Sequence, residues 1–220
     1  MNAREAFPGV LRSGRRLFTR SLLPGSKSFS KSLVRIRGAE YREWDPHRSK
    51  AAAAILRGIR NFPVGPGSRV LYLGISSGST ASFFSDIAGP DGVIYGVEIS
   101  ERSMRDLTPL AEKRGNIVPV LADARKPETY SWIEPVQVVY QDVATSDQSE
   151  ILIRNCGEFL IPGGFAMLAI KARSIDVTRP PREIYRQEQA KLRKHFRILD
   201  MVELEPYEMD HAFVVMRKPS

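Results

Sequence analysis

The sequence predicts an α/β fold built around a mostly parallel sheet of seven strands. From Val70 onward, short apolar segments alternate with amphipathic segments, and glycine-containing turns separate many of them. This alternation is typical of βαβ units, in which helices cover both faces of a parallel sheet. The last two apolar segments are joined only by the short polar turn "EPYEMDH". We therefore expect an antiparallel strand pair at the C-terminal end of the sheet.

The expected elements follow from these apolar and amphipathic periods. We expect strands at residues 70–73, 93–98, 117–121, 136–140, 165–171, about 196–204, and 212–217. We expect helices between them at residues 80–87, 102–113, 149–159 and 183–195. Upstream, "RSKAAAAILRGIRN" is rich in alanine and leucine, the best helix formers, and Asn61 with Pro63 is expected to end this helix.

The N-terminal region has a different pattern. Between Leu11 and Arg37, basic residues are mixed with apolar ones around the turn sequence "LLPGSKS". Such a pattern favours short strands and a hairpin. We therefore expect a small N-terminal β-subdomain over residues 1–42 and a second domain over residues 43–220, a size that can bury a substantial core.

The amino-acid composition limits the sites, the location and the partners that the chain can have. The single cysteine excludes an internal disulfide, and three scattered histidines lack metal-ligand spacing, so no metal site is predicted. No apolar run approaches the roughly 20 residues that a bilayer span requires, and no signal peptide is apparent. We therefore expect no membrane association and a cytoplasmic location. The net charge of +8 favours a polyanionic partner.

The segment "VLYLGISSGSTASFFSDIAGPDGVIYGVEIS" predicts a nucleoside site. Its first strand runs into a glycine loop, Gly74 to Ser79, that enters a helix, and Glu98 ends the second strand. Glycines allow the backbone to approach a ligand closely, and an acid at the end of the second strand can accept hydrogen bonds from ribose hydroxyls. This arrangement indicates a Rossmann-like fold with a nucleoside-bearing cofactor.

The neighbouring residues favour S-adenosylmethionine as that cofactor. Ser76 stands where a dinucleotide loop would prefer its second glycine, which argues against NAD. Asp123 and Asp142 follow the third and fourth strands, so three successive strand ends are acidic. Three acids fit a ligand that carries a sulfonium cation and no phosphate. The expected C-terminal strand pair is a further methyltransferase trait.

Several segments together resemble the fibrillarin family, in its archaeal form. They are "YREWDPHRSKAAAAIL", "GSRVLYLGISSGST", "GPDGVIYGVEISERSMRDL", "NIVPVLADARKPETY", "DVATSDQ" and "LEPYEMDHAFVV". The resemblance covers nearly the whole chain, from about Leu17. It implies a class I SAM-dependent methyltransferase fold and an RNA 2′-O-methyltransferase of box C/D ribonucleoproteins. It further implies a guide RNA, rRNA or tRNA targets, a Nop-family scaffold protein and a kink-turn-binding ribosomal-protein homologue as partners.

The resemblance also assigns the cofactor site. It implies cofactor contacts in the glycine loop and after three strands: Gly74, Gly78, Ser79, Thr80, Glu98, Ile99, Asp123, Ala124, Asp142, Val143, Ala144 and Thr145. Thr145 departs from the family pattern, which generally reads D-V-A-Q at this place. Gln148 matches a glutamine of the family.

The catalytic candidates are Lys50, Asp142 and Lys171, which resemble the Lys-Asp-Lys core of 2′-O-methyltransferases. For a fourth member, Asp210 and His211 in the last turn are both within reach, and the resemblance favours His211. Methyl transfer to a ribose hydroxyl requires in-line positioning and help in losing a proton. A carboxylate between two lysines can orient one amine beside the reacting hydroxyl. Lys171 ends an apolar strand, and Lys50 opens the alanine-rich helix.

Two other functions stay open from the sequence. The chain could be a non-catalytic structural subunit of an RNA particle with a weak SAM site. A nicotinamide-dependent oxidoreductase is the third reading, disfavoured by Ser76 and by the acidic strand ends.

Overall fold

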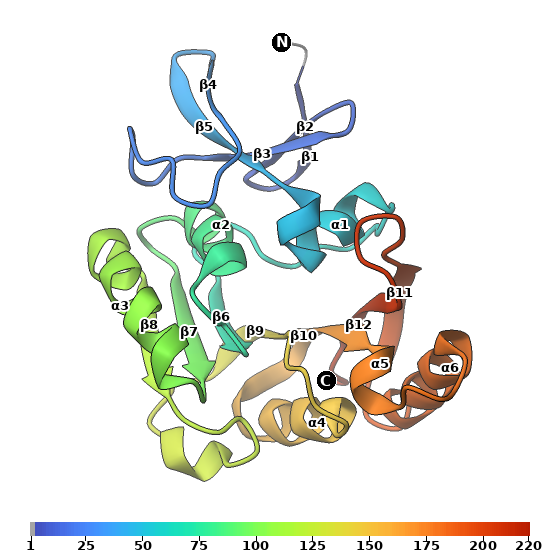
Figure 1. Ribbon diagram of the computed structural model, residues 1–220. Helices are drawn as coiled ribbons and strands as arrows, with labels where there is room; N and C mark the ends of the chain where they lie inside the picture. Colours follow the sequence, from blue (N-terminus) through green and yellow to red (C-terminus); the bar gives the residue numbers. More distant parts are fainter. Residues whose placement is uncertain (1–2) are drawn as a thin grey trace.

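The computed structural model describes residues 3–220, which form two sheets with helices packed between and around them (Figure 1). The smaller sheet is antiparallel, in the order β1-β2-β3-β5-β4. Its strands are β1 (Arg4–Phe7), β2 (Val10–Ser13), β3 (Arg16–Arg20), β4 (Leu33–Ile36) and β5 (Ala39–Trp44). The strands of this sheet therefore begin before Leu11, where the expected strand pattern started. The last strand extends two residues past the expected subdomain boundary at residue 42. The division into two domains stays a prediction.

The larger sheet has seven strands in the order β11-β12-β10-β9-β6-β7-β8. Its strands are β6 (Arg69–Leu73), β7 (Val93–Glu98), β8 (Ile117–Leu121), β9 (Val136–Gln141), β10 (Leu160–Lys171), β11 (Arg197–Glu203) and β12 (His211–Arg217). Strand β12 runs antiparallel to both β10 and β11, and the other neighbours pair in parallel. The predicted sheet and its antiparallel end are confirmed.

Helices cover both faces of this sheet. They are α1 (Lys50–Leu56), α2 (Ser79–Ala88), α3 (Glu101–Arg114), α4 (Gln148–Phe159), α5 (Ala172–Ile175) and α6 (Pro181–Leu192), with short 3₁₀ turns η1 (Pro46–Arg48) and η2 (Pro127–Tyr130). Helices α1, α2 and α3 share one apolar cluster, while η2, α4 and α6 share the other. None of the helices between residues 3 and 220 is long and apolar enough to cross a bilayer.

Several expected boundaries were wrong. The alanine-rich helix ends at Leu56 instead of near Asn61, because Gly58 takes a φ of +96° that an α-helix cannot continue. Strand β10 starts at Leu160, five residues before the expected start at Phe165, and contains a register irregularity between these two residues. Helix α6 stops at Leu192, and the four-residue helix α5 was not predicted.

The chain reverses its order across the sheet between β6 and β9. It runs outward from β6 through β7 to β8, then returns to place β9 on the other side of β6. Ligands of open α/β sheets bind at such a reversal, beyond the carboxyl ends of the strands. Here the reversal brings together the glycine loop after β6 and Asp142 after β9. The Asp142 N–H donates to the Leu73 carbonyl oxygen at 2.9 Å.

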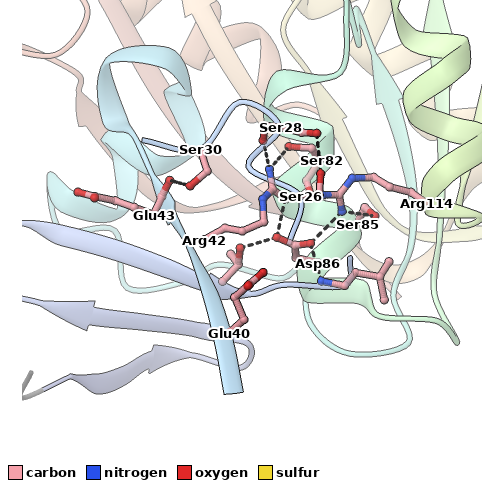
Figure 2. Close-up of polar contacts among 12 residues, drawn as sticks. Ser26, Ser28, Ser30, Glu40, Arg42, Glu43, Ser82, Ser85, Asp86 and Arg114 are labelled. Atoms are coloured by element: carbon pink, nitrogen blue, oxygen red, sulfur yellow. Dashed lines mark hydrogen bonds and ion pairs between the residues drawn. The ribbon is translucent and has the colours of Figure 1, made fainter. Parts of the chain in front are cut away.

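A buried ionic cluster joins the small sheet to helix α2 (Figure 2). The Asp86 carboxylate lies 2.7 Å from Arg42 of β5 and 2.8 Å from Arg114 of α3, and all three side chains are inaccessible to solvent. Thr19 and the Leu22 N–H also donate to Asp86. Burial lowers the pKa of the Arg42 guanidinium to about 10, so the group stays charged at neutral pH. The small sheet is thereby fixed against the helices that flank the large one.

Replacement of Asp86 by asparagine should destabilise the fold strongly, because two buried guanidinium groups lose their shared counter-charge. We expect a loss of about 3–5 kcal/mol in the free energy of unfolding, measured by urea titration. The matched control is Glu183→Ala, which breaks the exposed Arg179–Glu183 pair and should cost less than about 1 kcal/mol. Equal losses in the two variants would contradict a structural role for the cluster.

Candidate active site

A pocket of about 330 Å³ lies beyond the carboxyl ends of β6, β7, β8 and β9. The loops that follow these strands form its walls, as the chain reversal requires. Its lining consists of Gly74, Ser76, Val97, Glu98, Ile99, Ala122, Asp123, Ala124, Arg125, Asp142, Val143, Ala144, Thr145, Ile151 and Lys171. The pocket therefore combines acidic strand ends with small and apolar residues.

Most of the predicted cofactor contacts lie in this lining, and Gly78, Ser79 and Thr80 do not. All twelve stay predictions as cofactor contacts. A Cβ at Gly78 would meet Leu107 and Leu110 of α3 at 2.7 Å, so close packing explains the glycine. Thr80 is buried and donates to the Ser49 hydroxyl at 3.0 Å.

Glu98 links the two loops that open onto the pocket. Its Oε2 accepts a hydrogen bond from the Ser76 N–H at 2.9 Å, and its Oε1 accepts one from the Ser100 N–H at 2.8 Å. A carboxylate has about four acceptor positions, so two remain for ligand hydroxyls. Glu98 is thus held rigidly and can still bind a ribose.

Gly74 allows the two sides of the pocket to approach each other. Its φ is +78°, and a Cβ there would lie 3.1 Å from the Asp142 carbonyl oxygen and 3.1 Å from Val143 Cγ1. Only glycine adopts this conformation easily and leaves this space free. The close approach keeps the pocket narrow between β6 and β9.

Arg125 forms part of the outer wall. Its guanidinium binds Asp147 through two hydrogen bonds of 2.8 and 2.9 Å, and it lies 3.8 Å from Asp123. The hydrogen bond from Arg125 holds the pKa of the Asp147 carboxyl below its usual value. This pairing joins the loop after β8 to the start of α4.

Five further residues line the pocket but were not among the predicted cofactor contacts: Ser76, Val97, Ala122, Arg125 and Ile151. Four of them lie near predicted contacts in the loops or at the strand ends, so their place in the sequence could have indicated that they line the pocket. The sequence did not indicate that Ile151 lines the pocket, because an apolar residue in an amphipathic helix is typical of the hydrophobic core.

Asp142 brings two of the catalytic candidates together. Its Oδ1 lies 2.8 Å from the Nζ of Lys171 and 3.3 Å from the Nζ of Lys50. Lys171 also donates to the Asp142 carbonyl oxygen at 2.8 Å. Lys50 lies 4.0 Å from Glu208 on the turn before β12. The three side chains are largely, but not fully, buried, so a substrate hydroxyl can reach them.

His211 lies beside this trio. It starts β12 and pairs in register with Lys171, while its Nδ1 is 2.6 Å from the Met209 carbonyl oxygen. Its membership of the catalytic set stays a prediction. Below the trio, burial and the negative charge of Asp142 raise the pKa of Tyr72 and Tyr140 well above the ordinary value. Both phenols are therefore neutral and cannot act as bases.

The family model for Fibrillarin matches residues 2–220. The chain belongs to the fibrillarin family. A curated relative from Thermococcus sibiricus, a fibrillarin-like rRNA/tRNA 2′-O-methyltransferase, is 48% identical over 100% of both chains.

Two solved structures are also similar. The first is Aeropyrum pernix fibrillarin with natively bound S-adenosyl-L-methionine: TM-score 0.85, 47% identity, covering 94% of this chain and 92% of that one. The second is a fibrillarin/Nop5p complex: TM-score 0.87, 39% identity, covering 96% of this chain and 97% of that one. The predicted methyltransferase fold is confirmed by these similarities.

Proposed function

We propose that this chain transfers a methyl group from S-adenosylmethionine to ribose 2′-hydroxyls of rRNA and tRNA. The observation that carries the proposal is the carboxylate of Asp142 held between Lys50 and Lys171 at the edge of the pocket. The relatives named as rRNA/tRNA 2′-O-methyltransferases support the reaction and its substrates.

The pocket fits S-adenosylmethionine by the chemistry of its lining. Glu98 has acceptor positions for ribose hydroxyls, and Asp123 stands where it can accept from an adenine amino group. Apolar contacts from Val143 and Ile151 suit a flat ring, while Asp142 favours a nearby cation. The SAM bound to Aeropyrum pernix fibrillarin supports this assignment.

The mechanism follows from the positions of the charged groups. The bound cofactor supplies an activated methyl group, so the protein contributes mainly alignment. Asp142 holds the amine of Lys171 at 2.8 Å. In its neutral form, which the nearby positive charge of Lys50 favours, this amine would take up the proton that the ribose hydroxyl loses. Lys50, at the start of α1, would also place a positive charge beside the developing oxyanion.

We further propose that the reaction takes place in a box C/D particle. The partners would be a guide RNA, a Nop-family scaffold protein and a kink-turn-binding ribosomal-protein homologue. The fibrillarin/Nop5p complex supports the scaffold partner, and the chain's charge of +8 suits an RNA partner. The archaeal sources of the relatives support a cytoplasmic setting.

Replacement of Asp142 by asparagine should abolish most methylation, because the carboxylate that holds both amines is lost. In a particle reconstituted with scaffold, kink-turn protein and guide RNA, transfer of radiolabelled methyl to target RNA should fall by about 100-fold or more. Asp91→Asn, an exposed carboxylate in the loop before β7, is the control and should keep wild-type turnover. Near wild-type turnover in Asp142→Asn would refute the mechanism.

Glu98→Ala should weaken SAM binding, since the ribose loses its charged acceptor. By calorimetric titration of the isolated chain we expect a dissociation constant about 10- to 100-fold higher, from hydrogen bonds worth about 1.5–3 kcal/mol. Glu158→Ala, at the far end of α4, should bind SAM as the wild type does. An unchanged dissociation constant in Glu98→Ala would place the cofactor elsewhere.

A further inference from the structure

The side chain of Gln148 bridges two strand ends at the floor of the site. It lies at the start of α4 and is completely buried. Its Oε1 accepts a hydrogen bond from the Lys171 N–H at 2.9 Å. Its Nε2 donates to the carbonyl oxygens of Thr145 at 2.7 Å and Lys171 at 3.1 Å. One amide therefore joins the loop after β9 to the end of β10.

These three bonds require an amide. The site presents one partly buried N–H and two partly buried carbonyl oxygens, so the side chain must accept once and donate twice. A carboxylate would face two carbonyl oxygens without a proton to donate. An apolar side chain would remove all three of these hydrogen bonds, which is costly.

A second buried glutamine supports the first. Gln141, the last residue of β9, is also completely buried and donates from its Nε2 to the Gln148 carbonyl oxygen at 2.7 Å. Gln141 directly precedes Asp142. The two glutamines thus connect the backbone beside Asp142, through the start of α4, to the backbone of Lys171.

This connection joins the backbone segments that carry Lys171 and Asp142. Lys171 is held at its backbone by Gln148, and at its amine by the Oδ1 and carbonyl oxygen of Asp142, each at 2.8 Å. Movement of the β10 end away from the loop after β9 would separate the amine from the carboxylate. A misplacement of about 1 Å at a reacting group can reduce a rate by about 100-fold.

We propose that Gln148 is a positioning residue that sets the separation of Lys171 from Asp142 for methyl transfer. The inference rests on the proposed function, because it assigns the residue a part in that reaction. Gln148 contacts only backbone groups, so it acts through Lys171 and not on the RNA or the cofactor.

The structure offers a closely matched control in Asn116. This amide is also buried, and its Nδ2 donates to the carbonyl oxygens of Ser85 at 3.0 Å and Gly89 at 2.8 Å. Its Oδ1 accepts from the Ser85 hydroxyl at 2.5 Å. Asn116 precedes β8 at the amino edge of the sheet, away from the pocket. Asn116→Ala therefore removes a comparable number of buried hydrogen bonds among residues that do not line the pocket.

The test compares Gln148→Ala with Asn116→Ala in the reconstituted particle. Single-turnover methylation is measured at saturating SAM and RNA, so that changes in binding do not enter the rate, and the melting temperature of each variant is recorded. We expect Gln148→Ala to lose about 100-fold in rate. Asn116→Ala should keep the wild-type rate at a similar loss of melting temperature.

Equal rates for the two variants would overturn the proposal and leave Gln148 a purely structural role. If Gln148→Ala does not fold, Gln148→Met retains the volume of the side chain and is measured instead; should that variant also fail to fold, the positioning role is overturned. The wild-type particle and Asp142→Asn are measured alongside. An inactive wild type contradicts the proposed function itself, whereas an active wild type with an unaffected Gln148 variant contradicts only the positioning role.

Discussion

The placement of one carboxylate between two lysines from distant parts of the chain is the constraint on which this site depends. Asp142 follows β9, Lys171 ends β10, and Lys50 is the first residue of helix α1. Neighbouring parallel strands end at the same edge, which brings Asp142 and Lys171 near each other. The proposed bridge by Gln148 then sets their separation. Lys50 needs a separate support, because its helix has only seven residues.

The small sheet and its ionic contacts supply that support. The chain passes from β5 through η1 directly into α1, so the position of β5 determines where Lys50 begins its helix. Asp86 binds Arg42 of β5 and fixes that strand against α2. The four alanines Ala51–Ala54 are fully buried and let α1 pack closely on the sheet. A structural cluster remote from the pocket thus helps to place a charged group of the site.

Much of the large sheet could be predicted from the sequence, and the small sheet less well. Strands β7 and β8 have clear apolar runs, and they begin and end where expected. Strands β1 and β2 have four residues each, contain an arginine and are partly exposed. Their apolar residues therefore form no alternating pattern long enough to indicate a strand. The Lys–Asp–Lys trio was predictable from a family resemblance, because spacing alone does not relate residue 50 to residue 142. The bond between Gln148 and Lys171 and the place of Ile151 in the pocket required the packed structure, since both side chains are buried and Lys171 lies 23 residues from Gln148.

The position of the transferred methyl group shows whether the chain methylates the ribose 2′-oxygen at the Asp142 site. A reconstituted particle would be given SAM with a deuterated methyl group, and the target RNA would be digested to nucleosides and analysed by mass spectrometry. A reaction at the Asp142 site predicts the label on the ribose 2′-oxygen of the nucleotide that the guide RNA selects. A label on a base, or an unlabelled RNA in a fully assembled particle with bound SAM, would contradict it.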